Sequence, residues 1–212
     1  MSLKSILKDY LVRIREQRAQ PNSSAELSYR DHLSWLFAEV AKELKHDSTR
    51  FTNEAKTGAE VPGRPDYAVT DGLNEIGYVE AESLTTDLDH MAGATLEQNK
   101  RLKENLHNFL LTNHFDFQLF VDGKKELSAR LPEPPEQGKI TVSDAVVEDF
   151  QRLFDRFLDA SAPPATSAEA IAKAMARRAR LLRFAAEQLL SQENGPLHGY
   201  WEAYKETLYP DM

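Results

Sequence analysis

The stretch "GRPDYAVTDGLNEIGYVEAES", residues 63–83, holds two short apolar runs separated by a glycine-containing turn. Such runs are typical of paired strands, so we expect "DYAVT" and "IGYVEA" to form a hairpin joined by "DGLNE". Counting outward from the turn places Asp66 and Glu80 within about one residue of being opposite each other. Glu80 and Glu82 share one face because side chains alternate along a strand. The sequence therefore predicts three carboxylates close together at one end of a hairpin.

Three carboxylates held together repel one another unless a cation lies among them. Mg²⁺ fits this requirement, because it is bound by one or two carboxylates and otherwise by water and phosphate oxygens. A metal ion in such a place activates water and stabilises charge on a phosphate, as nucleases require. Acidic residues at strand ends are also commonly just solvated, and the spacing alone leaves that alternative open.

Composition sets the protein class. The chain has 212 residues, with 41% hydrophobic and 28% charged residues, which is typical of a globular protein. No apolar run approaches the roughly 20 residues that cross a bilayer. The absence of cysteine excludes disulfides, thiolate–zinc sites and cysteine nucleophiles. A net charge of −8 argues against a surface that binds nucleic acid over its whole extent, although local basic patches remain compatible with it. We expect a cytoplasmic protein with no membrane partner.

The remaining patterns predict a mixed α/β domain followed by helices. Apolar residues at helical spacing predict a first helix ending near residue 18 and a second one carrying Leu27 to Leu44. Further strand signals occur in "RFTNEA", "NFLLTN", "FDFQLFVDGK" and "KELSARL", with a tight turn around His114. The segment from Leu84 to Leu106 reads as helical with a break at Gly93. The prolines of "LPEPPEQG" predict a boundary, with one domain over residues 1–135 and a helical connector over residues 136–212.

The chain also resembles a known family. The motifs "TNE", "GRPDYAV", "IGYVEAE", "LEQNKR", "LLTN" and "FVDGK" occur in order. They are similar to those of the N-terminal PD-(D/E)XK nuclease domain of restriction-modification proteins, in which the nuclease is fused to an adenine-specific DNA methyltransferase (type IIG and type I-like single-chain enzymes), sometimes with a helicase. The resemblance begins near residue 26 and is strongest over residues 51–123. It implies a restriction-endonuclease-like mixed β-sheet flanked by helices.

The resemblance implies a role for each matching residue. Asp66 matches the central metal ligand, and Glu80 matches the acidic member of the Glu-x-Lys motif. Glu26 matches a helical glutamate that helps to hold the metal through water, and Gln98 matches a glutamine that orients the active centre or the substrate. Glu26 could instead support the start of a helix, and Gln98 could be an exposed helical residue. The implied cofactor is Mg²⁺, with Mn²⁺ able to take its place.

Two positions depart from the family pattern. Glu82 stands where the family usually has lysine, and Leu102 replaces an aromatic residue four positions after the glutamine. A glutamate cannot offset negative charge in the transition state. Three alternatives stay open: Glu82 takes a proton from water or adds a metal ligand, Lys56 or Lys100 supplies the missing cation, or the site is inactive.

The last third of the chain carries a basic stripe. Lys173, Arg177 and Arg180 share one face of a predicted helix, which suits contact with DNA phosphates. A solvated helix face and packing against a neighbouring domain are the alternatives.

These patterns lead to three hypotheses. The first is a Mg²⁺-dependent DNA endonuclease domain of a restriction-modification protein, acting on double-stranded DNA in defence against foreign DNA. Its partners would be methyltransferase, helicase or specificity domains of a longer protein, and two copies would associate to cut both strands. The second is a catalytically degenerate nuclease fold that binds DNA or docks other domains. The third and weakest is a free-standing defence or repair nuclease.

Overall fold

The computed structural model describes residues 1–20, 27–53, 65–72 and 74–160, together with the isolated positions 171, 172, 175, 179 and 199. The chain divides into two units, Met1–Ala162 and Pro163–Met212. The helices and strands described below belong to the first unit.

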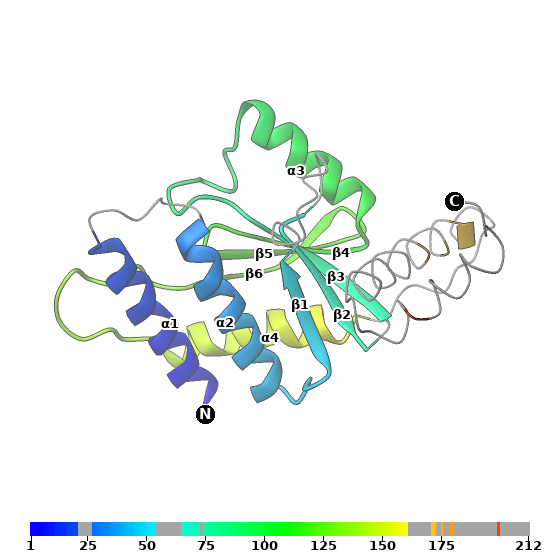
Figure 1. The fold of residues 1–212 in the computed structure, drawn as a ribbon. Coiled ribbons are helices and arrows are strands. Elements are labelled where there is room, and N and C mark those ends of the chain that lie inside the picture. Colours follow the sequence, from blue (N-terminus) through cyan, green and yellow to red (C-terminus); the bar gives the residue numbers. More distant parts are fainter. Residues whose placement is uncertain are drawn as a thin grey trace. The chain divides into compact units, whose positions relative to one another are not determined.

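A six-stranded mixed sheet forms the centre of the first unit (Figure 1). Its strands lie in sequence order, from β1 at one edge to β6 at the other. Neighbouring strands are antiparallel except for β3 and β4, which are parallel and are connected through α3. The strands are β1 (Thr49–Asn53), β2 (Tyr67–Asp71), β3 (Asn74–Ala81), β4 (Asn108–Thr112), β5 (Asp116–Val121) and β6 (Lys124–Arg130).

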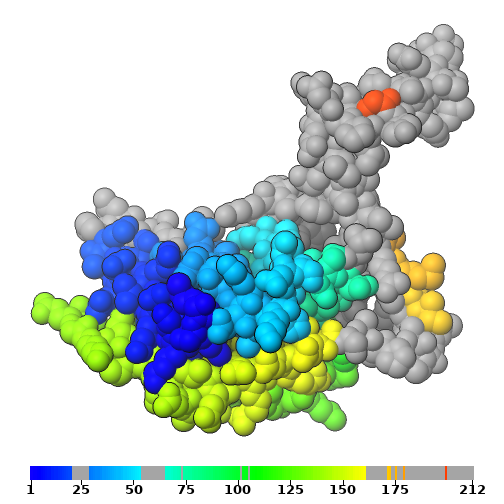
Figure 2. Space-filling model, turned by 90° about the horizontal axis from the view of Figure 1, so that it is seen from below, coloured from blue at the N-terminus to red at the C-terminus, as the bar shows by residue number. Residues whose placement is uncertain are grey.

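Four helices cover the sheet: α1 (Leu3–Arg18), α2 (Leu27–Glu43), α3 (Gly93–Asn105) and α4 (Asp144–Leu158). The first, second and fourth pack on one face and α3 lies on the other (Figure 1). In Figure 2, the blue, light-blue and yellow surfaces of α1, α2 and α4 adjoin one another. Serine side chains cap two of these helices, because Ser2 accepts a hydrogen bond from the Ser5 amide and Ser143 accepts one from the Val146 amide.

Successive side chains along a strand point to opposite faces of the sheet, so the two faces contribute to two separate cores. On β4, Leu110 packs in the larger core beneath α1, α2 and α4. Phe109 and Leu111 point the other way and join Leu102 of α3 in the smaller core. The central strand is therefore apolar on both faces, and its five residues are all buried.

The β2–β3 hairpin contains an irregularity that sets its register. Near the turn, Thr70 pairs with Glu75, but beyond the irregularity Val69 pairs with Gly77. Ile76 is thus the extra residue of a β-bulge. The register then continues to the pair of Tyr67 with Val79, which brings the next residues, Asp66 and Glu80, opposite each other.

All six predicted strands are present, and His114 adopts a left-handed φ of 78° in the predicted turn between β4 and β5. The prediction for residues 84–106 was wrong in its first part, because α3 begins only at Gly93. The preceding segment is a polar loop. Its side chains bond to nearby backbone and hydroxyl groups, as when Asp87 Oδ1 accepts from the Asp89 amide at 3.0 Å.

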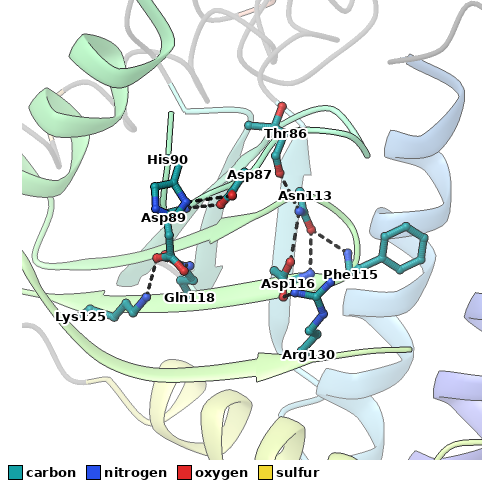
Figure 3. A network of polar contacts seen from close by, with 10 residues as sticks. All are labelled: Thr86, Asp87, Asp89, His90, Asn113, Phe115, Asp116, Gln118, Lys125 and Arg130. Atoms are coloured by element: carbon teal, nitrogen blue, oxygen red, sulfur yellow. Dashed lines mark hydrogen bonds and ion pairs between the residues drawn. The ribbon is translucent and has the colours of Figure 1, made fainter. Parts of the chain in front are cut away.

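Contacts with the sheet hold this loop in place (Figure 3). Asp89 Oδ1 accepts from Gln118 Nε2 at 3.1 Å and lies 2.8 Å from Lys125 Nζ. Asn113 Nδ2 donates to the Thr86 carbonyl at 2.8 Å. The loop between β3 and α3 is therefore fastened to β5, β6 and the turn at Asn113.

The first unit extends beyond the predicted boundary at residue 135. Helix α4 packs its Phe150, Phe154 and Phe157 rings into the larger core. The proline-rich connection before it is anchored as well, since the Gly138 carbonyl accepts from Arg15 Nη1 at 2.9 Å. Residues 136–160 thus complete the α/β unit. The role of the second unit as a connector stays a prediction.

Among the residues that the structure describes, no helix combines the length and the apolar character needed to cross a membrane.

Candidate active site

Asp66 and Glu80 meet where β2 begins and β3 ends. The Asp66 amide donates to Glu80 Oε2 at 3.0 Å, and the Ala81 amide donates to Asp66 Oδ2 at 2.9 Å. Each strand thus supplies a backbone N–H to the other strand's carboxylate. This exchange fixes both side chains to the sheet and holds them close together, as the hairpin register predicted.

Glu80 is an unusual carboxyl group, because it is buried with 6% of its surface exposed. Burial, followed by the negative charge of Asp66, raises the pKa of Glu80 to about 8. The raised pKa favours the protonated form of Glu80 at neutral pH. Additional positive charge beside the carboxyl would favour its ionised form.

Two consecutive residues of α3 bind the acidic residues of β3. Gln98 Nε2 donates to Glu80 Oε1 at 2.7 Å, and Asn99 Nδ2 donates to Glu82 Oε1 at 2.6 Å. Asn99 is fully buried and also donates to the Thr95 carbonyl at 3.0 Å. Glu80 and Glu82 both reach α3, so they share a face as predicted.

Arg30 brings positive charge to the site from α2. Its Nη2 lies 2.8 Å from Asp66 Oδ1, with the two side chains only 14% and 12% exposed. The Arg30 carbonyl accepts hydrogen bonds from the Tyr67 hydroxyl at 2.8 Å and from the Ser34 hydroxyl at 2.9 Å. Burial raises the pKa of Tyr67 to about 12, so its hydroxyl remains a donor at neutral pH. Asp66 and the adjacent Tyr67 thus hold the side chain and the backbone of the same arginine.

Arg30 and Asn99 are site residues that the sequence analysis did not identify. Asn99 directly follows the predicted Gln98, and its position on the buried side of an amphipathic helix was the available signal. Arg30 lies four positions after Glu26 in the sequence. Its pairing with Asp66 depends on how α2 packs over the sheet, and no local pattern encodes that packing.

The other predicted site residues lie elsewhere or outside the described residues. Lys100 is exposed on α3, and Leu102, on the same helix, is buried in the smaller core. The remaining members fall outside the described residues: Glu26, Lys56, Lys173, Arg177 and Arg180.

The residues present fit a Mg²⁺ ion, although they do not form a complete protein cage. Within residues 1–20, 27–53, 65–72 and 74–160, no three acidic or histidine side chains are grouped closely enough to hold a metal ion. Mg²⁺ does not require such a group, because it keeps several waters and uses one or two carboxylates together with substrate phosphates. Asp66 and the buried Glu80 supply hard oxygen ligands of this kind.

Comparisons with known proteins support the fold. No protein-family model matches the chain, and no curated protein matches it. A solved structure described as "cryoEM structure DrdV-DNA complex" is similar, with a TM-score of 0.53 and 19% sequence identity. The match covers 91% of this chain and 18% of that chain, so this chain spans less than a fifth of that protein's length. The likeness and the six-stranded mixed sheet confirm the predicted fold class, a restriction-endonuclease-like α/β fold.

Proposed function

We propose that this chain is a DNA endonuclease domain that hydrolyses phosphodiester bonds with the aid of Mg²⁺. The observation that carries this proposal is the meeting of Asp66 and Glu80 on adjoining strand ends, each fixed by a backbone N–H of the other strand. In a sheet of this fold, two fixed carboxylates at the ends of neighbouring inner strands are suited to share a divalent ion and to accept a phosphate beside it.

In this proposal Asp66 and Glu80 hold the ion. When bound, Mg²⁺ lowers the pKa of a coordinated water and neutralises charge on the phosphate oxygens. The chain's own residues prepare the site. Gln98 orients Glu80, the Ala81 amide orients Asp66, and the burial of Glu80 excludes bulk water. Glu80 would release its proton to solvent on holding the ion.

The proposed substrate is double-stranded DNA, which is consistent with the likeness to a protein solved in complex with DNA. A place within a longer restriction-modification protein is part of the proposal and rests on the resemblance of the sequence motifs. Methyltransferase and specificity domains, a cytoplasmic location and pairing of two copies for double-strand cleavage belong to the same proposal.

One observation favours a second function, that of a degenerate nuclease fold which binds DNA or docks a neighbouring domain. Glu82 replaces the usual lysine and is held by Asn99 against α3, which leaves a carboxylate where a cation is expected. A site that keeps its architecture but lacks this charge could bind DNA without cutting it.

Plasmid cleavage and metal titration distinguish the two functions. The wild-type chain, Asp66→Ala, Glu80→Ala and Glu82→Lys are incubated with supercoiled plasmid in Mg²⁺ or Mn²⁺, and metal binding is followed by calorimetry. Glu104→Ala, at an exposed position of α3, is the matched control. Cleavage by the wild type and the control that is lost in the two alanine variants supports the nuclease. Cleavage by Glu82→Lys alone identifies the degenerate form.

A further inference from the structure

The proposed site has a shortage of positive charge. Asp66 and Glu80 each accept a hydrogen bond from the other strand's backbone, and Glu82 lies two residues along β3 from Glu80 on the same face, bound to Asn99 of α3. A DNA phosphate would bring further negative charge, which increases as water attacks phosphorus. One divalent ion does not balance this sum, so the reaction needs a second cation near the carboxylates.

We propose that Arg30 supplies this second cation and contacts the phosphate during hydrolysis. This inference rests on the proposed function. In the reaction a water oxygen forms a bond to phosphorus, and one ester P–O bond breaks. Arg30 donates hydrogen bonds to the phosphate oxygens and keeps its own proton throughout. It takes the electrostatic role that residue 82, being a glutamate, cannot fill.

The position of Arg30 is fixed from two directions. Its guanidinium is in contact with Asp66 at 2.8 Å, and its carbonyl is bound by the hydroxyls of Tyr67 and Ser34. Tyr67 directly follows Asp66 in the chain and is itself fully buried. Arg30 of α2 is thus held beside the first residues of β2. A cation fixed in this way does not need to reorganise as charge develops on the substrate.

The chemistry of the guanidinium also suits the role. Arginine stays charged at all relevant pH values, and its planar group of donors matches phosphate oxygens. Its exposed fraction of 14% puts the group at the boundary between the interior and the solvent, where its charge is only weakly screened. Lys100, the lysine of α3 considered for this role, is exposed one residue beyond Asn99, whose side chain points inward to Glu82.

The test compares the whole chain as wild type, Arg30→Gln and Arg30→Lys, with Arg152→Gln as a matched control. Arg152 is a largely exposed arginine of α4 that pairs with Asp149. For each protein, Mn²⁺ affinity is measured by calorimetry and plasmid cleavage is measured at saturating Mn²⁺. Circular dichroism establishes that each variant is folded. Arg30→Lys keeps a charge beside Asp66 and gives a second readout if Arg30→Gln does not fold.

We expect Arg30→Gln to bind Mn²⁺ at least as tightly as the wild type, because a cation that opposes metal entry at Asp66 has been removed. Its cleavage rate at saturating metal should nevertheless fall by about 100-fold or more, the loss typical of removing one transition-state donor. Arg30→Lys should fall by a smaller factor, because it keeps the charge but loses the planar donor group.

Three results overturn the inference. The first is an Arg30→Gln cleavage rate equal to that of the wild type at saturating Mn²⁺. The second is a loss of cleavage rate that disappears when more metal is added. Either result would mean that Arg30 has only a structural role. The third applies if Arg30→Gln does not fold: an Arg30→Lys cleavage rate equal to the wild-type rate overturns the inference, because the planar donor group would then contribute nothing. In these cases the nuclease proposal stands. A wild-type chain that neither binds Mn²⁺ nor cuts DNA refutes the proposed function itself, and the inference with it.

Discussion

Replacing His114 with asparagine should make the protein more resistant to acid. The imidazole lies in the turn between β4 and β5 and is 2% exposed. Burial, followed by the positive charges of Arg30 and His32, lowers the pKa of His114 to about 3. The folded protein therefore keeps this ring neutral, whereas the unfolded chain takes up a proton near the ordinary value of 6.5.

The size of the effect follows from this difference. Between pH 6.5 and about 3 the unfolded state binds one more proton than the folded state, so the free energy of unfolding falls as the pH falls. At about 1.4 kcal/mol per pH unit, acidification from pH 7 to pH 5 should cost about 2 kcal/mol through this residue alone. Asparagine has no such titration, and it tolerates the left-handed φ of 78° at this position better than most residues.

Urea unfolding at pH 7, 6 and 5 measures the difference. The chain has two tryptophans, so a Trp201→Phe background leaves Trp35 of α2 as the reporter for the first unit. The variant also loses the edge contact of His114 with the Tyr29 ring, but that loss is the same at every pH. Leu96→Asn, at an exposed residue of α3 that carries no titratable group, is the control and should keep the wild-type acid dependence. Parallel stability curves for His114→Asn and the wild type would refute the reasoning.

Three further predictions concern the carboxylates and the sheet. Glu80→Gln, measured by the same urea assay in EDTA, should gain about 2 kcal/mol relative to the wild type between pH 6 and pH 8, because the folded wild type keeps this carboxyl protonated up to a pKa of about 8 whereas the unfolded chain loses the proton near the ordinary value of 4.5; equal slopes would contradict this. Asn99→Asp places a second carboxylate 2.6 Å from that of Glu82 and should lower the melting temperature more at pH 8 than at pH 5, whereas a pH-independent change would argue against charge repulsion. Gly77→Ala adds a Cβ that would lie 2.7 Å from both Phe157 Cε2 and Asn108 Nδ2, so urea unfolding should show a loss of about 1–3 kcal/mol, and an unchanged midpoint would mean that both side chains move aside freely.

Short-range patterns predicted the sheet because they record which face of each strand is buried. The alternation in "DYAVT" and "IGYVEA" and the acidic residues at their ends were enough to bring Asp66 and Glu80 together. The loop before α3 was misread because its apolar spacing looks helical. Its Asp87 carboxylate instead bonds to the Asp89 amide, which competes with helix formation.

Contacts between distant segments were beyond such patterns. The pairing of Arg30 with Asp66 depends on how α2 crosses the sheet, and nothing in "AELSYRDHL" records that crossing. The extent of the first unit depends on such contacts as well. The prolines of residues 131–138 predict a boundary, but Leu131 is fully buried and its amide donates to the Phe115 carbonyl at 2.8 Å. The connection therefore leads α4 back onto the sheet.

The bulge at Ile76 divides the β2–β3 ladder into a tip and a base. The base, from Tyr67 to Val69 with Gly77 to Val79, has a ladder of its own that carries the two carboxylates. The tip near the exposed Gly72 pairs with β3 only beyond the irregularity, although Thr70 and Asp71 continue the regular pairing of β2 with β1. Gly72 lies across the bulge from the acidic pair, so a fluorescent label attached there is separated from the two carboxylates by the base of the hairpin.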